Sequence, residues 1–129
     1  IENPKLSLYL YNNVRKAYKA GAEVDFDSDL DSMDQHYRFD NALLGELDKI
    51  FDITLAQAMQ NSCSHKIYID IYIDGEVLCM LLSNSMCSDF IDSEEQYKRY
   101  DCSTDDVNIY SMCYDENVFF KIDIKPFEA

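Results

Sequence analysis

The chain has 129 residues, of which 47% are hydrophobic and 28% charged, and its 25 acidic residues against 11 basic ones give a formal net charge of −14. This length and apolar content predict a single folded domain over residues 1–129 and exclude a disordered tail. The acidic excess works against binding to nucleic acids, because that binding depends on Lys and Arg that neutralise phosphates. No apolar run approaches the roughly 20 residues of a membrane span. We therefore expect a cytoplasmic domain that contacts neither membranes nor nucleic acids.

The first twenty residues predict an amphipathic helix with signals at both ends. Asn3 suits the N-cap, Pro4 suits the first helical position, and Gly21 provides a stop. Its buried stripe is expected to consist of residues spaced three or four apart: Leu6, Leu10, Val14 and Ala17. The following residues 22–31 alternate acidic with apolar side chains, which predicts an extended segment with one wet face.

A second helix is predicted to open at Ser32, which forms a capping-box pair with Gln35. Its apolar periodicity continues for nearly thirty residues, which is long for a helix of a globular protein. We therefore expect a break near residues 52–54, after which Asp52 caps a shorter helix that reaches about Asn61.

Two hairpins are predicted further along the chain. In Lys66–Asp74, isoleucines alternate with tyrosines and aspartates, which is the period of a strand with one apolar face. Asp74-Gly75 is a favoured dipeptide for a two-residue turn. The return strand from Glu76 to Ser83 is apolar on both faces and is therefore expected to lie centrally. Val107–Tyr114 and Val118–Lys125 predict the second hairpin.

A short helix is predicted between the hairpins, from Glu94 to about Asp101, with Ser93 and Gln96 as another capping pair. Strands joined by tight turns form antiparallel sheets, and helices that precede them cover one side. The predicted fold is therefore α+β, with an antiparallel sheet of about four strands, in two hairpins, packed against two or three helices.

The residues that could carry chemistry are sparse. The five cysteines are widely spaced and lack any CxxC pair, which is typical of reduced thiols in a cytosolic protein. Cys63-Ser64-His65 is the one local thiol–imidazole neighbourhood, and it has no glycine-built turn to present a nucleophile. Three glycines in the whole chain leave little backbone for a phosphate-binding loop. We expect no catalytic residue, no cofactor and no enzymatic activity.

An acidic run invites comparison with a calcium-binding loop. An EF-hand loop that begins at Asp25 needs Gly at its sixth position and Glu at its twelfth, where this chain has Leu30 and His36. We therefore expect no metal site. The run is either a solvated acidic segment before a helix N-terminus or a partner-binding patch, which would comprise Asp25, Asp27, Asp29 and Asp31.

The first hairpin predicts a second patch. Asp70 and Asp74 alternate with Tyr68 and Tyr72, and side chains two apart on a strand are separated by about 6.6 Å, so the carboxylates form a regular ladder. Tyrosine adds rigid contact area and is typical of binding surfaces. Two acids of the predicted short helix are expected to extend this patch: Glu94 and Glu95.

These patches favour a small acidic protein-binding inhibitor that mimics nucleic acid and occupies the basic groove of a DNA- or RNA-processing enzyme. In composition, with few Gly and Pro and much Asn, Asp, Ile and Tyr, the chain resembles small phage-encoded inhibitors, including anti-CRISPR proteins, and this likeness assigns no residue. An immunity protein against a basic nuclease toxin uses the same physics. A structural or assembly subunit, whose acidity serves solubility, and a hydrolase with a carboxylate pair are further alternatives. The oligomeric state stays open.

Overall fold

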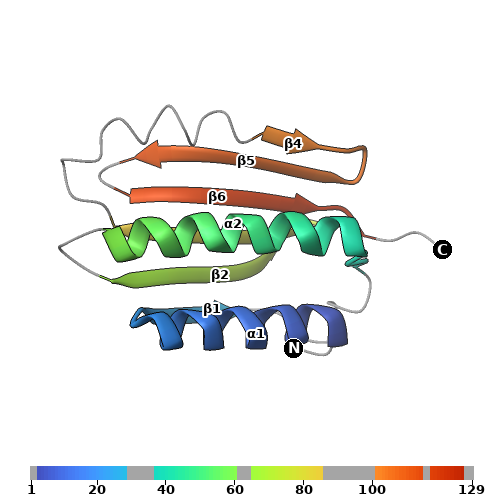
Figure 1. Ribbon diagram of the computed structural model, residues 1–129. Helices are drawn as coiled ribbons and strands as arrows, with labels where there is room; N and C mark the ends of the chain where they lie inside the picture. Colours follow the sequence, from blue (N-terminus) through green and yellow to red (C-terminus); the bar gives the residue numbers. More distant parts are fainter. Residues whose placement is uncertain (1–2, 29–36, 61–64, 86–100, 115–116, 127–129) are drawn as a thin grey trace.

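The computed structural model describes residues 3–28, 37–60, 65–85, 101–114 and 117–126. Within them, two helices lie against one six-stranded sheet whose strand order is β1-β2-β3-β6-β5-β4 (Figure 1). The predicted α+β class is confirmed. The elements are α1 (Pro4–Ala20), β1 (Glu23–Ser28), α2 (Asn41–Gln60), β2 (Lys66–Asp74), β3 (Val77–Ser85), β4 (Asp101–Ser103), β5 (Val107–Tyr114) and β6 (Asn117–Ile124).

The core lies between the helices and one face of the sheet. In Figure 1, α2 lies in front of the centre of the sheet and α1 in front of β1. Alternate residues of the central strands and one stripe of α2 are almost completely buried: Leu47, Ile50, Phe51, Ile67, Ile69, Ile71, Leu78, Met80, Leu82, Phe120 and Ile122. Both helices lie on the same side, so the opposite face of the sheet has no helix over it among the described residues. None of the described helices is long and apolar enough to cross a membrane.

Helix α1 matches the prediction. The Asn3 side chain accepts hydrogen bonds from the backbone N–H groups of Lys5 and Leu6, at 3.1 and 3.2 Å, which caps the first turn. Gly21 follows the last turn with φ of 95°, a left-handed conformation that glycine adopts without steric cost. The predicted stripe faces the core, with Val14 as its half-buried member.

Helix α2 differs from the prediction in two ways. It runs without a break from Asn41 to Gln60, so the expected interruption at residues 52–54 is wrong. Thr54 fits the helix interior because its hydroxyl donates to the carbonyl of Ile50 at 2.9 Å. Asp40 precedes the helix and caps it, because its carboxylate accepts from the N–H of Leu43 at 2.8 Å. The predicted capping pair Ser32 and Gln35 lies outside the described residues.

The strands confirm both hairpins and the central place of β3. Asp74 pairs with Val77, so the two-residue turn is Gly75-Glu76, one residue later than predicted. The extended acidic segment is confirmed over residues 23–28, and its predicted remainder to residue 31 lies outside the described residues. Strand β1 pairs in parallel with β2 and adds an edge strand that we did not predict. The short helix from Glu94 lies outside the described residues, except that its expected last residue, Asp101, begins β4.

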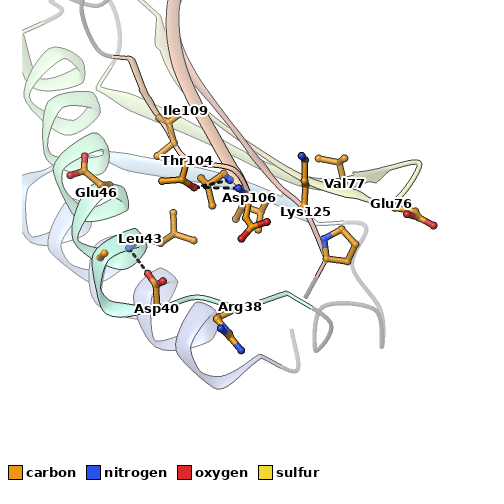
Figure 2. Close-up of a pocket in the computed structure, with 14 residues that line it drawn as sticks. Arg38, Asp40, Leu43, Glu46, Glu76, Val77, Thr104, Asp106, Ile109 and Lys125 are labelled. Carbon is orange, nitrogen blue, oxygen red and sulfur yellow. Dashed lines mark hydrogen bonds between the residues drawn. The ribbon is translucent and has the colours of Figure 1, made fainter. Parts of the chain in front are cut away.

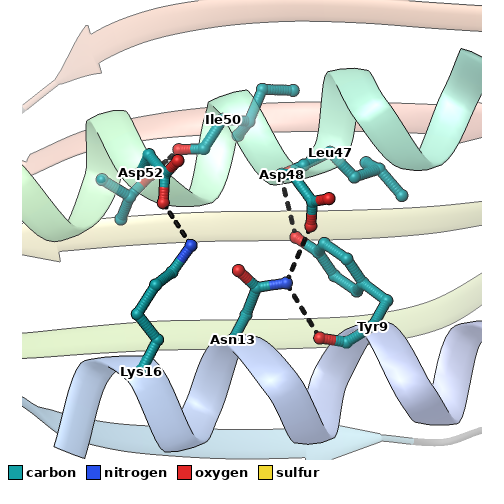
Figure 3. A network of polar contacts seen from close by, with 8 residues as sticks. Tyr9, Asn13, Lys16, Leu47, Asp48, Ile50 and Asp52 are labelled. Carbon is teal, nitrogen blue, oxygen red and sulfur yellow. Dashed lines mark hydrogen bonds and ion pairs between the residues drawn. The ribbon is translucent and has the colours of Figure 1, made fainter. Parts of the chain in front are cut away.

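A polar network joins the two helices (Figure 3). The Tyr9 hydroxyl donates to the carbonyl of Leu47 at 3.1 Å, and Asn13 Nδ2 donates to the Tyr9 carbonyl at 2.9 Å and to Asp48 at 3.0 Å. Lys16 and Asp52 form an ion pair one turn further along. Burial, followed by the nearby carboxylates of α2, raises the pKa of Tyr9 far above its ordinary value. This network fixes α1 against α2.

Candidate functional site

The face of the sheet turned away from the two described helices, called the open face below, carries the described acidic and tyrosine residues singled out in the sequence. The parallel register places Asp25 beside Tyr68 and Asp27 beside Asp70, so the two predicted patches meet on one face. Tyr72 lies half-buried on the same strand, and Asp74 is exposed. The structure thus brings six of the ten predicted residues to the same part of the sheet. The other four lie outside the described residues: Asp29, Asp31, Glu94 and Glu95.

Cations reach into this face and reduce its charge. Lys66 Nζ lies 4.0 Å from a carboxylate oxygen of Asp25 and 5.3 Å from the centre of the Tyr68 ring. Lys121 Nζ lies 3.5 Å from Asp123 on β6. The face that carries the predicted ladder of carboxylates thus also carries lysines, which weakens its likeness to a nucleic-acid backbone.

One cysteine lies at the centre of the open face. Cys79 on β3 is only 2% exposed. Burial, followed by the neighbouring Asp123, raises the pKa of its thiol, so the nucleophilic thiolate is disfavoured. Cys79 behaves as a small apolar residue of the strand, as the sequence predicted.

A pocket opens at the end of the sheet where α2 begins (Figure 2). Its volume is about 810 Å³. The start of α2, the β2–β3 turn, the β4–β5 turn and the end of β6 converge there, with an apolar floor and a rim of both charges: Arg38, Asp40, Ala42, Leu43, Glu46, Glu76, Val77, Thr104, Asp106, Val107, Ile109, Ile124, Lys125 and Pro126.

Several polar groups of this pocket already serve the fold. Asp40 caps α2, as described above. The Thr104 hydroxyl accepts from the N–H groups of Asp106 and Val107, at 3.4 and 3.1 Å, and so stabilises the β4–β5 turn. The pocket thus combines an apolar floor with charged side chains of both signs at its rim, from Arg38, Glu46, Glu76, Asp106 and Lys125.

A second polar cluster lies at the opposite end of α2, between that helix and β3. Thr54 and Gln57 continue the buried stripe of the helix after Ile50, at spacings of four and three residues. The Gln57 Oε1 atom is buried and accepts no hydrogen bond in the described part of the chain. Asn84, 1% exposed, follows Leu82 on the helix-facing side of β3. Asn84 pairs with Ile67 near the start of β2, the strand that follows the C-terminal end of α2 in the chain.

We call Thr54, Gln57 and Asn84 the polar end of the α2–β3 interface. The rest of this interface is apolar, and a buried acceptor without a donor is costly. Sequence reasoning missed all three residues. A signal was present in the helix, because Gln57 lies seven residues after Ile50, where the apolar stripe predicts another core residue.

Similar proteins were found at the level of structure alone. No protein-family profile and no curated protein sequence matches the chain. Two structures of the catalytic domain of histidine kinase ThkA, both described as nucleotide-free, superpose with TM-scores of 0.62 and 0.61 at 12% identity. They cover 95% and 96% of this chain and 95% of theirs. A further crystal form of that domain gives a TM-score of 0.53.

The chain has the fold of these histidine kinase catalytic domains. This finding corrects the function predicted from charge. The interpretation as an anti-CRISPR-type inhibitor or nucleic-acid mimic was wrong, and so was the expectation of a non-enzyme, because the matched fold is that of an enzyme's catalytic domain. Net charge reports on solubility and association and says nothing of the fold, which is why it misled.

Proposed function

We propose that this chain is a nucleotide-binding domain of the histidine kinase catalytic type. The observation that carries the proposal is the match to the ThkA catalytic domain over 96% of this chain and 95% of that one. The aligned part therefore spans nearly the whole length of both chains. The ThkA structures are described as nucleotide-free, which names the class of ligand to test.

The polar end of the α2–β3 interface is the place that we propose for the base of the nucleotide. Gln57 Oε1 is a buried acceptor that has no hydrogen-bond donor among the described residues. An amide side chain can accept from the exocyclic amino group of adenine and donate to a ring nitrogen, a pairing that geometry favours. Asn84 and Thr54 provide polar groups on either side of the same interface.

The phosphates must be held differently from those in a glycine-rich loop. The chain has three glycines: Gly21 ends α1, Gly45 lies within α2, and Gly75 forms the β2–β3 turn. None of them belongs to a phosphate-binding loop of the usual pattern. We therefore expect the base to dominate recognition, so that adenosine retains most of the affinity of ATP.

Calorimetric titration of the purified chain with ATP, ADP and adenosine, with and without magnesium, tests the proposal. Gln57→Leu is expected to weaken binding by about tenfold, because the loss of one buried hydrogen bond costs roughly 1–3 kcal/mol. Gln60→Leu is the matched control, since Gln60 is exposed on the same helix. Absence of binding at millimolar ATP would contradict the proposed function. Equal effects of the two substitutions on binding would show that the base does not bind at the α2–β3 interface.

A further inference from the structure

The outer side of α1 and β1 carries a concentration of exposed apolar side chains. All four large apolar residues that the described chain exposes belong to these two elements: Leu8, Tyr11, Tyr18 and Phe26. Tyr11 is 61% exposed, Tyr18 57% and Phe26 42%. Tyr11, Tyr18 and Phe26 line a mostly apolar groove of about 580 Å³ between helix and strand, together with Val14 and with Arg15 as the charged member of the lining. Aromatic side chains exposed in a cluster mark interaction surfaces.

The groove runs beside a free edge of the sheet. Strand β1 is the first strand of the order and pairs with β2, and no described strand lies on its other side. The backbone of such an edge is a template for another strand. Its side chains alternate, with Phe26 in register with the buried Ile69 on the helix side and Asp25 and Asp27 on the open side.

We propose that an extended segment of a partner protein, in which basic and apolar residues alternate, adds to β1 as a seventh strand. In this arrangement the apolar residues of the segment enter the groove on the helix side. Its basic residues lie beside the carboxylates of the open side, where Asp27 is exposed and makes no ion pair within the described residues. This inference is independent of nucleotide binding.

Charge selects this partner over a second copy of the chain. Two copies that pair through β1 about a twofold axis place their strands antiparallel. The exposed acids Glu23, Asp25 and Asp27 of one copy then face the same acids of the other. Like charges opposite one another on paired strands are destabilising, whereas lysines or arginines there are favourable.

A synthetic heptapeptide of alternating lysine and valine or isoleucine, labelled with a fluorophore, is the probe. Its binding to the whole chain is measured by fluorescence anisotropy, and its site by amide chemical shifts in NMR spectra. We expect the shifts to concentrate in residues 23–28. Asp25→Lys with Asp27→Lys is expected to weaken binding by about tenfold at low salt, and less at high salt where charges are screened. Tyr11→Ala with Tyr18→Ala is expected to weaken it at both salt concentrations.

Two controls separate strand addition from simple attraction between charges. Asp105→Lys with Asp106→Lys makes the same change of charge beside β4, at the opposite edge of the sheet, and is expected to leave binding nearly unchanged. A peptide of the same composition, with its lysines and its apolar residues in two blocks, is expected to lose most of the affinity.

Three results would overturn the proposal. The first is equal affinity for the alternating and the block peptide, and the second is an equal loss for the two pairs of aspartate substitutions. The third is a concentration-dependent dimer, seen in analytical ultracentrifugation, that the peptide dissociates. If a variant fails to fold, the test uses the unchanged chain and a peptide in which glutamate replaces each lysine. Equally tight binding of the glutamate peptide and the lysine peptide would refute the proposal.

Discussion

Replacement of Gln57 by leucine is expected to make the unliganded protein more stable. The Oε1 atom of Gln57 is buried and has no donor among the described residues, and such an acceptor costs roughly 1–3 kcal/mol relative to solvent. A leucine removes that cost and continues the apolar stripe of Leu47 and Ile50. The difference in shape between the two side chains offsets about 1 kcal/mol of the gain. The net increase in the free energy of unfolding is therefore about 1 kcal/mol.

This gain corresponds to a measurable shift in melting temperature. At about 2.1 cal/mol/K per residue, a chain of 129 residues unfolds with an entropy of about 270 cal/mol/K, so 1 kcal/mol raises Tm by about 4 °C. Calorimetry without nucleotide measures the shift, with Gln60→Leu as the control. A Tm below that of the unchanged chain would show that the Gln57 amide already stabilises the fold, and the reasoning would fail.

Four further substitutions test other parts of the structure. Asn13→Ala removes the side chain that bridges the helices and is expected to lower the free energy of unfolding by about 1–3 kcal/mol. The control Asn12→Ala, at an exposed position of the same helix, is expected to lower it by less than about 0.5 kcal/mol. Urea denaturation measures both values. The pKa of Tyr9 is higher in the fold than in the unfolded chain, so its contribution is present below about pH 10 and lost as pH rises above it. Stability above that pH should fall more steeply for the unchanged chain than for Tyr9→Phe; parallel curves would contradict this. Gly45→Ala is expected to stabilise the fold by about 0.5–1 kcal/mol, because a methyl group at this position of α2 meets open space. Gly75→Ala is expected to destabilise the fold by about 1–2 kcal/mol, because Gly75 has φ of 63°. Thermal melts that rank the two variants in the opposite order would refute this explanation.

The elements that depend on local signals were predictable. Asn3, Pro4 and Gly21 mark the ends of α1 because capping uses side chains within a few residues of the helix terminus. The alternation in Lys66–Asp74 correctly predicted which face of β2 packs on the core, because alternation along a strand is also a local signal. The start of α2 was misplaced because Asp40, which we did not recognise as a cap, holds the first turn, and the chain is not helical at residues 37–40.

The features that depend on distant segments were not predictable from local patterns. The parallel pairing of β1 with β2 joins residues about forty positions apart, across the whole of α2. The pocket collects four separate turns and termini, and the polar end of the α2–β3 interface needs the register of β3 to bring Asn84 toward α2. The alternating acids of β1 were visible in the sequence, but their meeting with β2 on one face required the sheet.

The middle of the sheet has a consequence for how the chain can be divided. Its central ladder joins β3 to β6, strands from the two sides of residues 86–100. Among the described strands, all other ladders lie wholly within residues 1–85 or wholly within residues 101–129. Two fragments cut within that interval are expected to keep these internal pairings and to recognise one another through one seam, made of the β3–β6 ladder and the packing of β6 against α2. The architecture is thus bipartite, and reassembly of the separated halves would report directly on the strength of that seam.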